Sequence, residues 1–128
     1  MYKKINILII ATALCMLAAS CTDSKSPSGI AESFLHLMVK GDFDKAIEFY
    51  AANSEDGSMI LMFKDKIKAS LRDDKIKSYK IVSEEISDDG KRATVTYTTI
   101  SSNGNTKSGK VKFVKRDGVW KIKDDYNK

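Results

Sequence analysis

The sequence predicts an α+β domain in which three helices precede a four-stranded antiparallel sheet. Apolar residues recur at helical spacing up to residue 71, and after Lys75 the spacing changes to an alternation of two. Three turn dipeptides, Asp89-Gly90, Asn103-Gly104 and Asp117-Gly118, then separate four short β-rich runs. A sheet with one apolar face needs a second layer, so we expect the three N-terminal helices to pack on that face of an antiparallel meander.

The first helix is expected to begin at Ser26 and Pro27. Serine is a favoured N-cap residue, and proline fits the first helical position. Gly41 is a typical C-terminal stop. Between these limits the apolar side chains recur at steps of three and four, which predicts one buried face formed by Ile30, Phe34, Leu37 and Met38.

Two further helices are expected before the sheet. Asp42 can cap the second helix, and Asn53–Gly57 forms a break after it. The third helix is expected over about residues 58–72. The predicted apolar faces are Phe43, Ala46, Ile47 and Tyr50 in the second helix and Met59, Phe63, Ile67 and Leu71 in the third.

The last hairpin can be aligned from its turn. With Asp117-Gly118 as a two-residue loop, Phe113 faces Ile122 and Lys115 faces Trp120, and Val111 would then face Asp124. Both strands then agree on which face is apolar, so the register is well specified. The inner face collects Val111, Phe113, Trp120 and Ile122, and the outer face collects Lys110, Lys112, Lys121 and Lys123, with Val114 as its apolar exception.

The two preceding strands are less strongly aligned by their sequence. A three-residue loop at Asn103–Asn105 would place Tyr97 opposite Val111 and Val95 opposite Phe113. The first strand has two competing apolar sets, and a β-bulge could place both on the inner face. These sets are Tyr79 with Ile81 and Val82 with Ile86.

The first twenty residues read as a signal peptide. Met1–Lys4 contains two lysines, and Ile5–Ala19 is apolar apart from two residues. An apolar run of that length is short for a membrane span, which needs roughly 20 residues. We therefore expect residues 1–20 to be a leader, residues 21–27 a polar tether, and residues 28–128 the domain.

The leader ends in a sequence that resembles a lipobox, the recognition sequence of bacterial lipoprotein maturation. Leu17-Ala18-Ala19-Ser20-Cys21 supplies the small residues and the cysteine, although Ala18 stands where leucine is usual. The resemblance implies cleavage before Cys21 and attachment of lipid, including palmitate, at this residue. The expected partner is therefore a membrane, to which the lipid would anchor the protein. Thr22 is not the aspartate associated with inner-membrane retention, which favours the outer membrane; the side that the domain faces is left open.

Three motifs in order resemble a small family of lipoproteins that contain a domain of unknown function. These are Gly41-Asp42-Phe43-Asp44-Lys45-Ala46, Ala93-Thr94-Val95 and Asp117-Gly118-Val119-Trp120-Lys121-Ile122. That domain belongs to the nuclear transport factor 2-like (SnoaL-like, cystatin-like roll) superfamily, so the resemblance implies a cone-shaped roll over about residues 27–126. Enzymes of the superfamily use Asp, His or Tyr inside the cone, but none of their catalytic motifs matches this chain.

Composition argues against several classes of function. Without Lys3 and Lys4 the chain has 20 basic and 17 acidic residues, too small an excess to indicate nucleic-acid binding. Cys15 would leave with the leader, so no disulfide, cysteine metal site or internal thiol nucleophile is expected. His36 stands alone, and we expect it to be a surface or half-buried structural residue, with no metal and no cofactor bound.

The candidate site lies on the predicted inner face. Tyr97 is its titratable member, and Asp124 is in phase at the strand end, so the two could form a pair at a pocket mouth. An apolar cavity between the third helix and the sheet is the other possibility, against the plainer interpretation of a filled core. The candidate pocket residues are Phe63, Tyr97, Phe113, Trp120 and Asp124, with Met59 and Met62 as further apolar lining.

Three functions remain open from the sequence. The first is a non-enzymatic, lipid-anchored envelope protein whose roll binds a small ligand or a protein. The second is a SnoaL-like enzyme, an isomerase, dehydratase or hydrolase, that uses a pocket near Tyr97 and Asp124. The third is an interaction module that contacts its partner through the lysine-rich outer face of the sheet.

Overall fold

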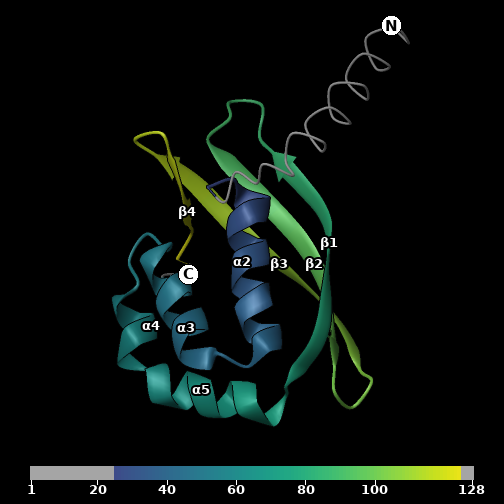
Figure 1. Ribbon diagram of the computed structural model, residues 1–128. Helices are drawn as coiled ribbons and strands as arrows, with labels where there is room; N and C mark the ends of the chain where they lie inside the picture. The colour runs from purple at the N-terminus through teal and green to yellow at the C-terminus, as the bar shows by residue number, and fades with distance from the viewer. Residues whose placement is uncertain (1–24, 125–128) are drawn as a thin grey trace, which may run out of the picture.

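A computed structural model describes residues 25–124 as helices followed by an antiparallel sheet, which confirms the α+β class (Figure 1). The leader and the proposed lipid site at Cys21 lie outside these described residues. The elements are α2 (Pro27–Lys40), α3 (Phe43–Ala52), α4 (Ser58–Met62), α5 (Lys64–Asp73), β1 (Ile76–Ile86), β2 (Arg92–Ser101), β3 (Thr106–Arg116) and β4 (Val119–Ile122).

Both predicted ends of the first helix are confirmed. The Ser26 hydroxyl oxygen accepts a hydrogen bond from the Gly29 backbone N–H at 3.0 Å, and Pro27 is the first helical residue. Gly41 adopts φ 78°, a left-handed conformation that glycine reaches without a steric penalty. Its N–H donates to Met38 O at 3.1 Å and closes the helix.

Asp42 is the N-cap residue of the second helix, as predicted, but its side chain does not cap it. Asp42 makes no side-chain cap hydrogen bond; its carboxylate instead lies 3.7 Å from Lys45 Nζ. The predicted face is nevertheless buried at Phe43, Ala46 and Ile47. Burial of this face, rather than a cap, therefore stabilises the start of α3.

The predicted third helix is two helices. Phe63, at φ −101° and ψ 20°, interrupts it between α4 and α5. The buried residue of α4 is Ile60, whereas Met59 and Phe63 are exposed. The predicted apolar face of this helix was therefore wrong at Met59 and Phe63, because α4 packs on α3 through the face that contains Ile60.

The last hairpin has the predicted register. Phe113 pairs with Ile122 and Lys115 with Trp120. The two turn residues, Asp117 and Gly118, have φ 52° and 78°, the two positive values that a type I′ turn needs. The sheet order is β1-β2-β3-β4, a simple meander.

The register of the middle hairpin was predicted wrongly by two residues. Tyr97 pairs with Gly109, and Val95 pairs with Val111. The loop closes at Ser101, whose N–H donates to Asn105 O at 2.9 Å, so Gly104 takes the left-handed position as the third loop residue. A shift of two keeps every side chain on its predicted face.

A β-bulge in β1 resolves the competition that the sequence left open. The register shifts between Ile81 and Ser83, and Val82 at that point is exposed. Ile81 then faces inward opposite Tyr97, and Ile86 returns to the inner phase opposite Ala93 although it remains half-exposed.

The helices form two layers above the concave face of the sheet (Figure 1). α2 lies directly on β1 and β2, and α3 lies beside α2. α4 and α5 make their main contacts with α3, and Leu71 of α5 also packs in a cluster with Ile76 of β1, so the expected arrangement of helices on one face of the sheet is confirmed.

The described residues contain a complete core. The main cluster joins Ile30 and Ala31 of α2 to the sheet, and two smaller clusters join the helices to one another. A chain of about 100 residues buries enough surface to be stable without disulfides or metals. Residues 25–124 therefore have the contents of an independently folding unit.

Candidate functional site

The concave face of the sheet has two ends with different chemistry. At the filled end the inward residues are apolar and covered by α2: Ala93, Val95, Phe113 and Ile122. At the open end the inward-pointing residues of the two central strands, β2 and β3, are polar: Tyr97, Thr99, Ser101 and Lys107. Two cavities lie at the open end.

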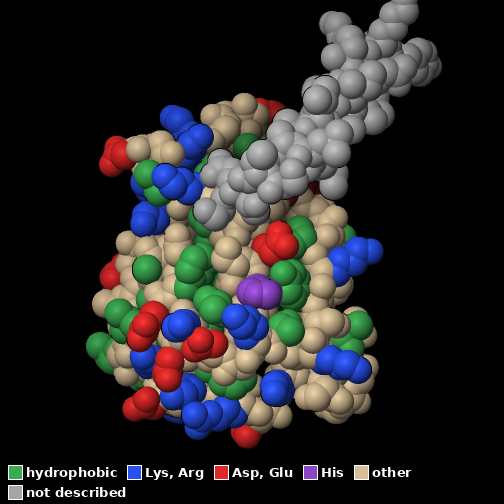
Figure 2. Space-filling view, in the orientation of Figure 1, with side chains coloured by type: hydrophobic (Ala, Val, Ile, Leu, Met, Phe, Trp, Pro, Cys, Tyr) green, Lys and Arg blue, Asp and Glu red, His purple; other side chains and the backbone are tan. Residues whose placement is uncertain are grey.

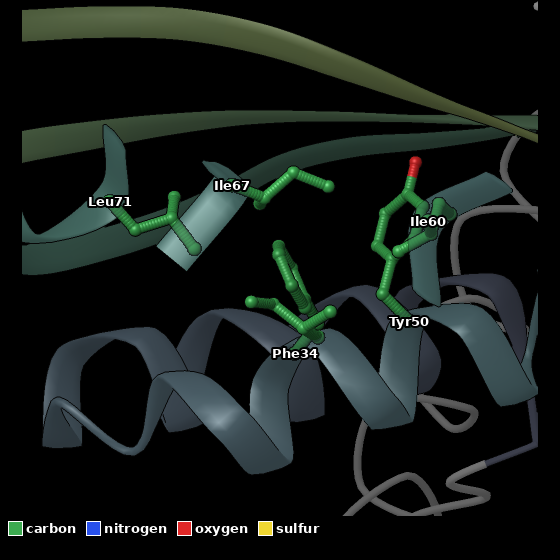
Figure 3. A pocket seen from close by; sticks show the side chains of 6 residues that line it. Phe34, Tyr50, Ile60, Ile67 and Leu71 are labelled. Atoms are coloured by element: carbon green, nitrogen blue, oxygen red, sulfur yellow. The ribbon is translucent and has the colours of Figure 1, made fainter. Parts of the chain in front are cut away.

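The first cavity, here named the chamber, has a volume of about 240 Å³. In Figure 3 the side chains of Phe34, Ile67 and Leu71 converge on it, and Tyr50 stands at its side. The rings of Phe34 and Tyr50 meet edge to face at 5.0 Å. All four described helices contribute to the lining, which consists of Phe34, Ile47, Tyr50, Ile60, Ile67 and Leu71.

The second cavity, here named the mouth, has a volume of about 370 Å³ and lies between α2, the end of α5 and the open end of the sheet. Phe34 and Leu71 line both cavities, so the chamber and the mouth are neighbours on either side of these two side chains. The other lining residues are Leu35, Met38, Ser70, Asp74, Ile76, Tyr97, Thr99, Ser101, Lys107 and Ser108.

Polar groups of the mouth lie on its sheet side. Lys107 of β3 forms an ion pair with Asp74, which connects the sheet to the end of α5. Ser101 is buried, and its hydroxyl donates to Asn103 Oδ1 at 2.7 Å. An apolar chamber beside a more polar mouth offers adjacent surfaces for the apolar and the polar end of one molecule.

Tyr97 is the titratable residue that the sequence placed on this face. Burial raises the pKa of its phenol above the ordinary value of 10.0, so the hydroxyl stays protonated at neutral pH. A protonated phenol can donate a hydrogen bond to a ligand but is a poor general base. The position of Tyr97 therefore suits ligand binding better than proton abstraction.

Gly109 makes room for the Tyr97 ring. The two residues are directly opposed, and a Cβ on Gly109 would lie 2.5 Å from the Tyr97 hydroxyl oxygen. Sequence reasoning missed this glycine because the predicted register placed Val111 there. A glycine inside a β-rich run was the available signal, since it often marks close approach of another group.

A set of ion pairs holds α5 over the chamber. Lys64 Nζ lies 2.9 Å from Glu48 and 3.7 Å from Asp44, and Lys68 Nζ lies 2.9 Å from Asp44. The hydrogen bond from Lys68 holds the pKa of Asp44 below its ordinary value, and Glu48 raises the pKa of Lys64. We name these four residues the latch. α5 has no buried residue of its own, so the latch and the partial burial of Ile67 and Leu71 hold it.

Of the five residues proposed for the pocket, Tyr97 lines the mouth. Phe113 is only 1% exposed and belongs to the filled end. Asp124 accepts a hydrogen bond from the Asp56 N–H at 2.6 Å, and its own N–H donates to Glu55 at 3.4 Å. The structure thus places Asp124 against the loop between α3 and α4, away from the residues that line the mouth with Tyr97.

The remaining proposed lining residues lie elsewhere as well. Phe63 is 45% exposed and Met62 is 71% exposed, and Met59 is also exposed. Trp120 packs at the edge of the filled end, with Lys115 Nζ 5.3 Å from its ring centroid. The residues that sequence reasoning did not propose for the site are Phe34, Leu71, Asp74 and Lys107, because α5 and β3 meet only in the folded chain.

His36 is exposed on α2, as expected for a surface histidine (Figure 2). Within residues 25–124, no group of three or more histidine, cysteine or acidic side chains is placed to hold a metal ion. Over the same residues, no helix is both long and apolar enough to cross a membrane.

The helices on one face of a meander sheet form an α+β cone, and this fold is similar to that of a solved structure described as NTF2-like. The chain belongs to the family described as domain of unknown function DUF4878, whose model matches residues 19–123. No curated protein matches the sequence.

Two solved structures share the fold. One is a crystal structure from Campylobacter jejuni, provisionally named an NTF2-like transpeptidase; it is 21% identical, with a TM-score of 0.52 over 77% of this chain and 98% of that one. The other is the solution structure of a SEC-C motif containing protein from Rhodopseudomonas palustris; it is 18% identical, with a TM-score of 0.57 over 84% of this chain and 83% of that one. At these identities the similarity establishes the fold alone.

Proposed function

We propose that this chain is a lipid-anchored protein of the cell envelope whose domain binds a small amphipathic molecule at the open end of the cone. The observation behind the binding function is that an apolar cavity and a more polar one adjoin, with Phe34 and Leu71 in the lining of both. The larger cavity alone falls within the usual range of small-ligand sites, roughly 300–1,000 Å³.

The lining favours binding over catalysis. The chamber offers only hydrocarbon and aromatic surface apart from the Tyr50 hydroxyl, which suits the apolar part of a ligand. The mouth offers hydroxyl groups and the Lys107–Asp74 ion pair, which suit its polar end. Tyr97 holds its proton, and Asp124 packs on a different loop, so the two do not form the acid and base of an enzyme site.

A cavity-filling substitution tests the binding function. Ile67→Phe places a larger side chain in the chamber, and Ala69→Phe places the same side chain on an exposed position of the same helix. With residues 25–124 and the amphipathic dye anilinonaphthalene sulfonate as the probe, titration calorimetry should show at least about a tenfold loss of affinity for Ile67→Phe. Ala69→Phe should bind like the wild type. Equal affinity in all three proteins, or no binding to the wild type, contradicts the proposal.

The anchor is supported by the position of Cys21, directly after the apolar run and five residues before the cap of α2. The five-residue step from Cys21 to Ser26 spans at most about 18 Å when extended, so acylation of Cys21 would hold the domain next to a bilayer. Several acyl chains give durable binding, and the residue after the cysteine favours the outer membrane. Intact-mass analysis of the membrane-extracted protein should show a chain that begins at Cys21 with added acyl mass. An unacylated chain, or one that begins elsewhere, contradicts the anchor.

A further inference from the structure

The outer face of the sheet, which points away from α2, is rich in basic residues. Tyr97 and Thr99 point inward, so the alternate residues Thr94, Thr96 and Thr98 point outward. Their cross-strand neighbours extend the same outer face over three further strands. The basic residues that occupy it, here named the lysine face, are Lys80, Arg92, Lys110, Lys112 and Lys123.

The acidic residue that the strand register places on this outer face is Glu85, which is opposite Thr94. Lys112 is opposite Thr94 and Lys110 is opposite Thr96. Lys123 lies beside Lys112, since its N–H donates to Lys112 O at 2.8 Å. Like charges side by side across strands are unfavourable, so a purely structural surface would not be expected to collect them.

Three lysines of the helical layer behave differently, although within residues 25–124 Lys40 and Lys66 of the same layer form no ion pair. Lys45, Lys64 and Lys68 all form ion pairs with acidic residues of α3 or its cap. Within residues 25–124, no ion pair involves any member of the lysine face. By strand alternation Lys121 also belongs to the outer face. Its Nζ, however, donates a hydrogen bond to Ala52 O at 3.4 Å. Among the described residues, the lysine face therefore has five basic side chains against the one carboxylate of Glu85, and Arg116 at its edge is paired with Glu55, so an excess of positive charge remains.

Two apolar side chains accompany this charge. Ile100 continues the outward alternation of β2 and is 41% exposed, and Val119 is opposite Arg116 on the same face and is 51% exposed. No aromatic side chain is interleaved with the lysines, so the face lacks the stacking platform of a nucleic-acid site. Basic residues with isolated aliphatic ones are typical of surfaces that contact lipid headgroups.

We infer that the lysine face docks on the anionic surface of a lipid bilayer. The inference rests on the proposed anchor, because acylation at Cys21 would keep the domain within reach of the headgroups. Lys110, Lys112 and Lys123 would lie nearest the phosphates, and α2 with the two cavities would point away from the membrane. The mouth would then stay accessible while the domain lies on the bilayer.

The test uses residues 25–124 without an anchor, so that lipidation does not contribute to binding. Cosedimentation is measured with vesicles of phosphatidylcholine alone and of an equimolar mixture with phosphatidylglycerol. The triple variant K110Q/K112Q/K123Q is compared with K40Q/K66Q/K75Q, which removes the same charge from exposed positions outside the lysine face. Each lysine near an anionic surface changes the partition coefficient about fivefold, so the first variant should lose more than about tenfold.

Four results would overturn the inference. Equal losses in the two variants would assign the effect to net charge rather than to this face. Equal binding to the two kinds of vesicle, or binding that high salt leaves unchanged, would exclude headgroup charge as the cause. Stronger binding to soluble polyglutamate than to vesicles would point to an acidic macromolecule instead. Because no lipid is attached to the tested domain, loss of the anchor would appear only in the intact-mass measurement.

Discussion

The filled end and the open end of the cone are built from the same two strands and the same helix, yet one is a core and the other a site. At the filled end, Val95 and Phe113 of the sheet meet Ile30 and Ala31 of α2, and all four are buried. At the open end, α2 presents Phe34 to a cavity rather than to an apolar sheet. The difference lies in the sheet residues, which change from apolar to hydroxyl-bearing and charged.

Three features keep the open end open. Gly109 removes a side chain opposite Tyr97. Thr99 and Lys107 are polar, so they cannot replace the missing apolar volume. α5 lies across this end without a buried residue of its own. Buried apolar packing is therefore concentrated at the filled end, and the open end is left as the candidate site.

The largest predicted effect is at the filled end. Phe113→Ala should lower the free energy of unfolding by about 3–5 kcal/mol, because it removes a fully buried ring from the main cluster. Urea unfolding of residues 25–124 measures the change. Val119→Ala, on the same sheet but half-exposed, is the control and should change stability by less than about 0.5 kcal/mol. A loss below about 1 kcal/mol for Phe113→Ala would contradict the distinction between the ends.

A matched pair of isoleucines compares α3 with α5 within the chamber. Ile47 is buried under α3, whereas Ile67 is only partly buried in α5, although both line the chamber. Ile47→Ala should cost about 2–5 kcal/mol of unfolding free energy. Ile67→Ala should cost about 1 kcal/mol, since less of its surface is removed from water on folding. Equal losses in urea unfolding would show that α5 is as firmly packed as α3.

The opposed pair Tyr97 and Gly109 gives a smaller and more specific effect. Gly109→Ala should destabilise the domain by about 1–3 kcal/mol, because the new Cβ overlaps the tyrosine ring. In the background of Tyr97→Ala the same substitution should be neutral or stabilising, as expected for alanine in place of glycine in a strand. A double-mutant cycle by thermal unfolding measures this coupling. Additive effects would mean that the register described for β2 and β3 is wrong.

The smallest predicted effect is on the latch. Lys68 lowers the pKa of Asp44, so the ionised carboxylate stabilises the fold when the pH is above the ordinary pKa of 3.8. This stabilisation is lost as the pH falls through the lowered pKa of Asp44. Asp44→Asn should therefore speed amide hydrogen exchange in α5 at neutral pH, and the difference from the wild type should vanish in strong acid. Asp65→Asn, on α5 but outside the latch, should exchange like the wild type. An unchanged exchange rate for Asp44→Asn would show that the latch does not hold α5.

The sequence was sufficient where a short-range rule applied. Ser26-Pro27 and Gly41 predicted both ends of α2, and Asp117-Gly118 predicted the register of the last hairpin, because caps and two-residue turns depend on neighbouring residues. It was insufficient where two local solutions were equally good. The loop after β2 could close around Asn103 or one residue later, and its actual closure changed the partner of Tyr97 from Val111 to Gly109.

By itself the sequence determined the order of the elements, the inward and outward faces of the strands, and Cys21 as the candidate anchor, since each follows from periodicity or from a contiguous motif. Only the tertiary structure decided where the site lies. Phe34, Leu71 and Lys107 come from three distant segments that meet at one end of the cone. Which apolar stripe becomes core and which lines a cavity depends on what packs opposite it, and that partner is fixed only when the helices and the sheet come together.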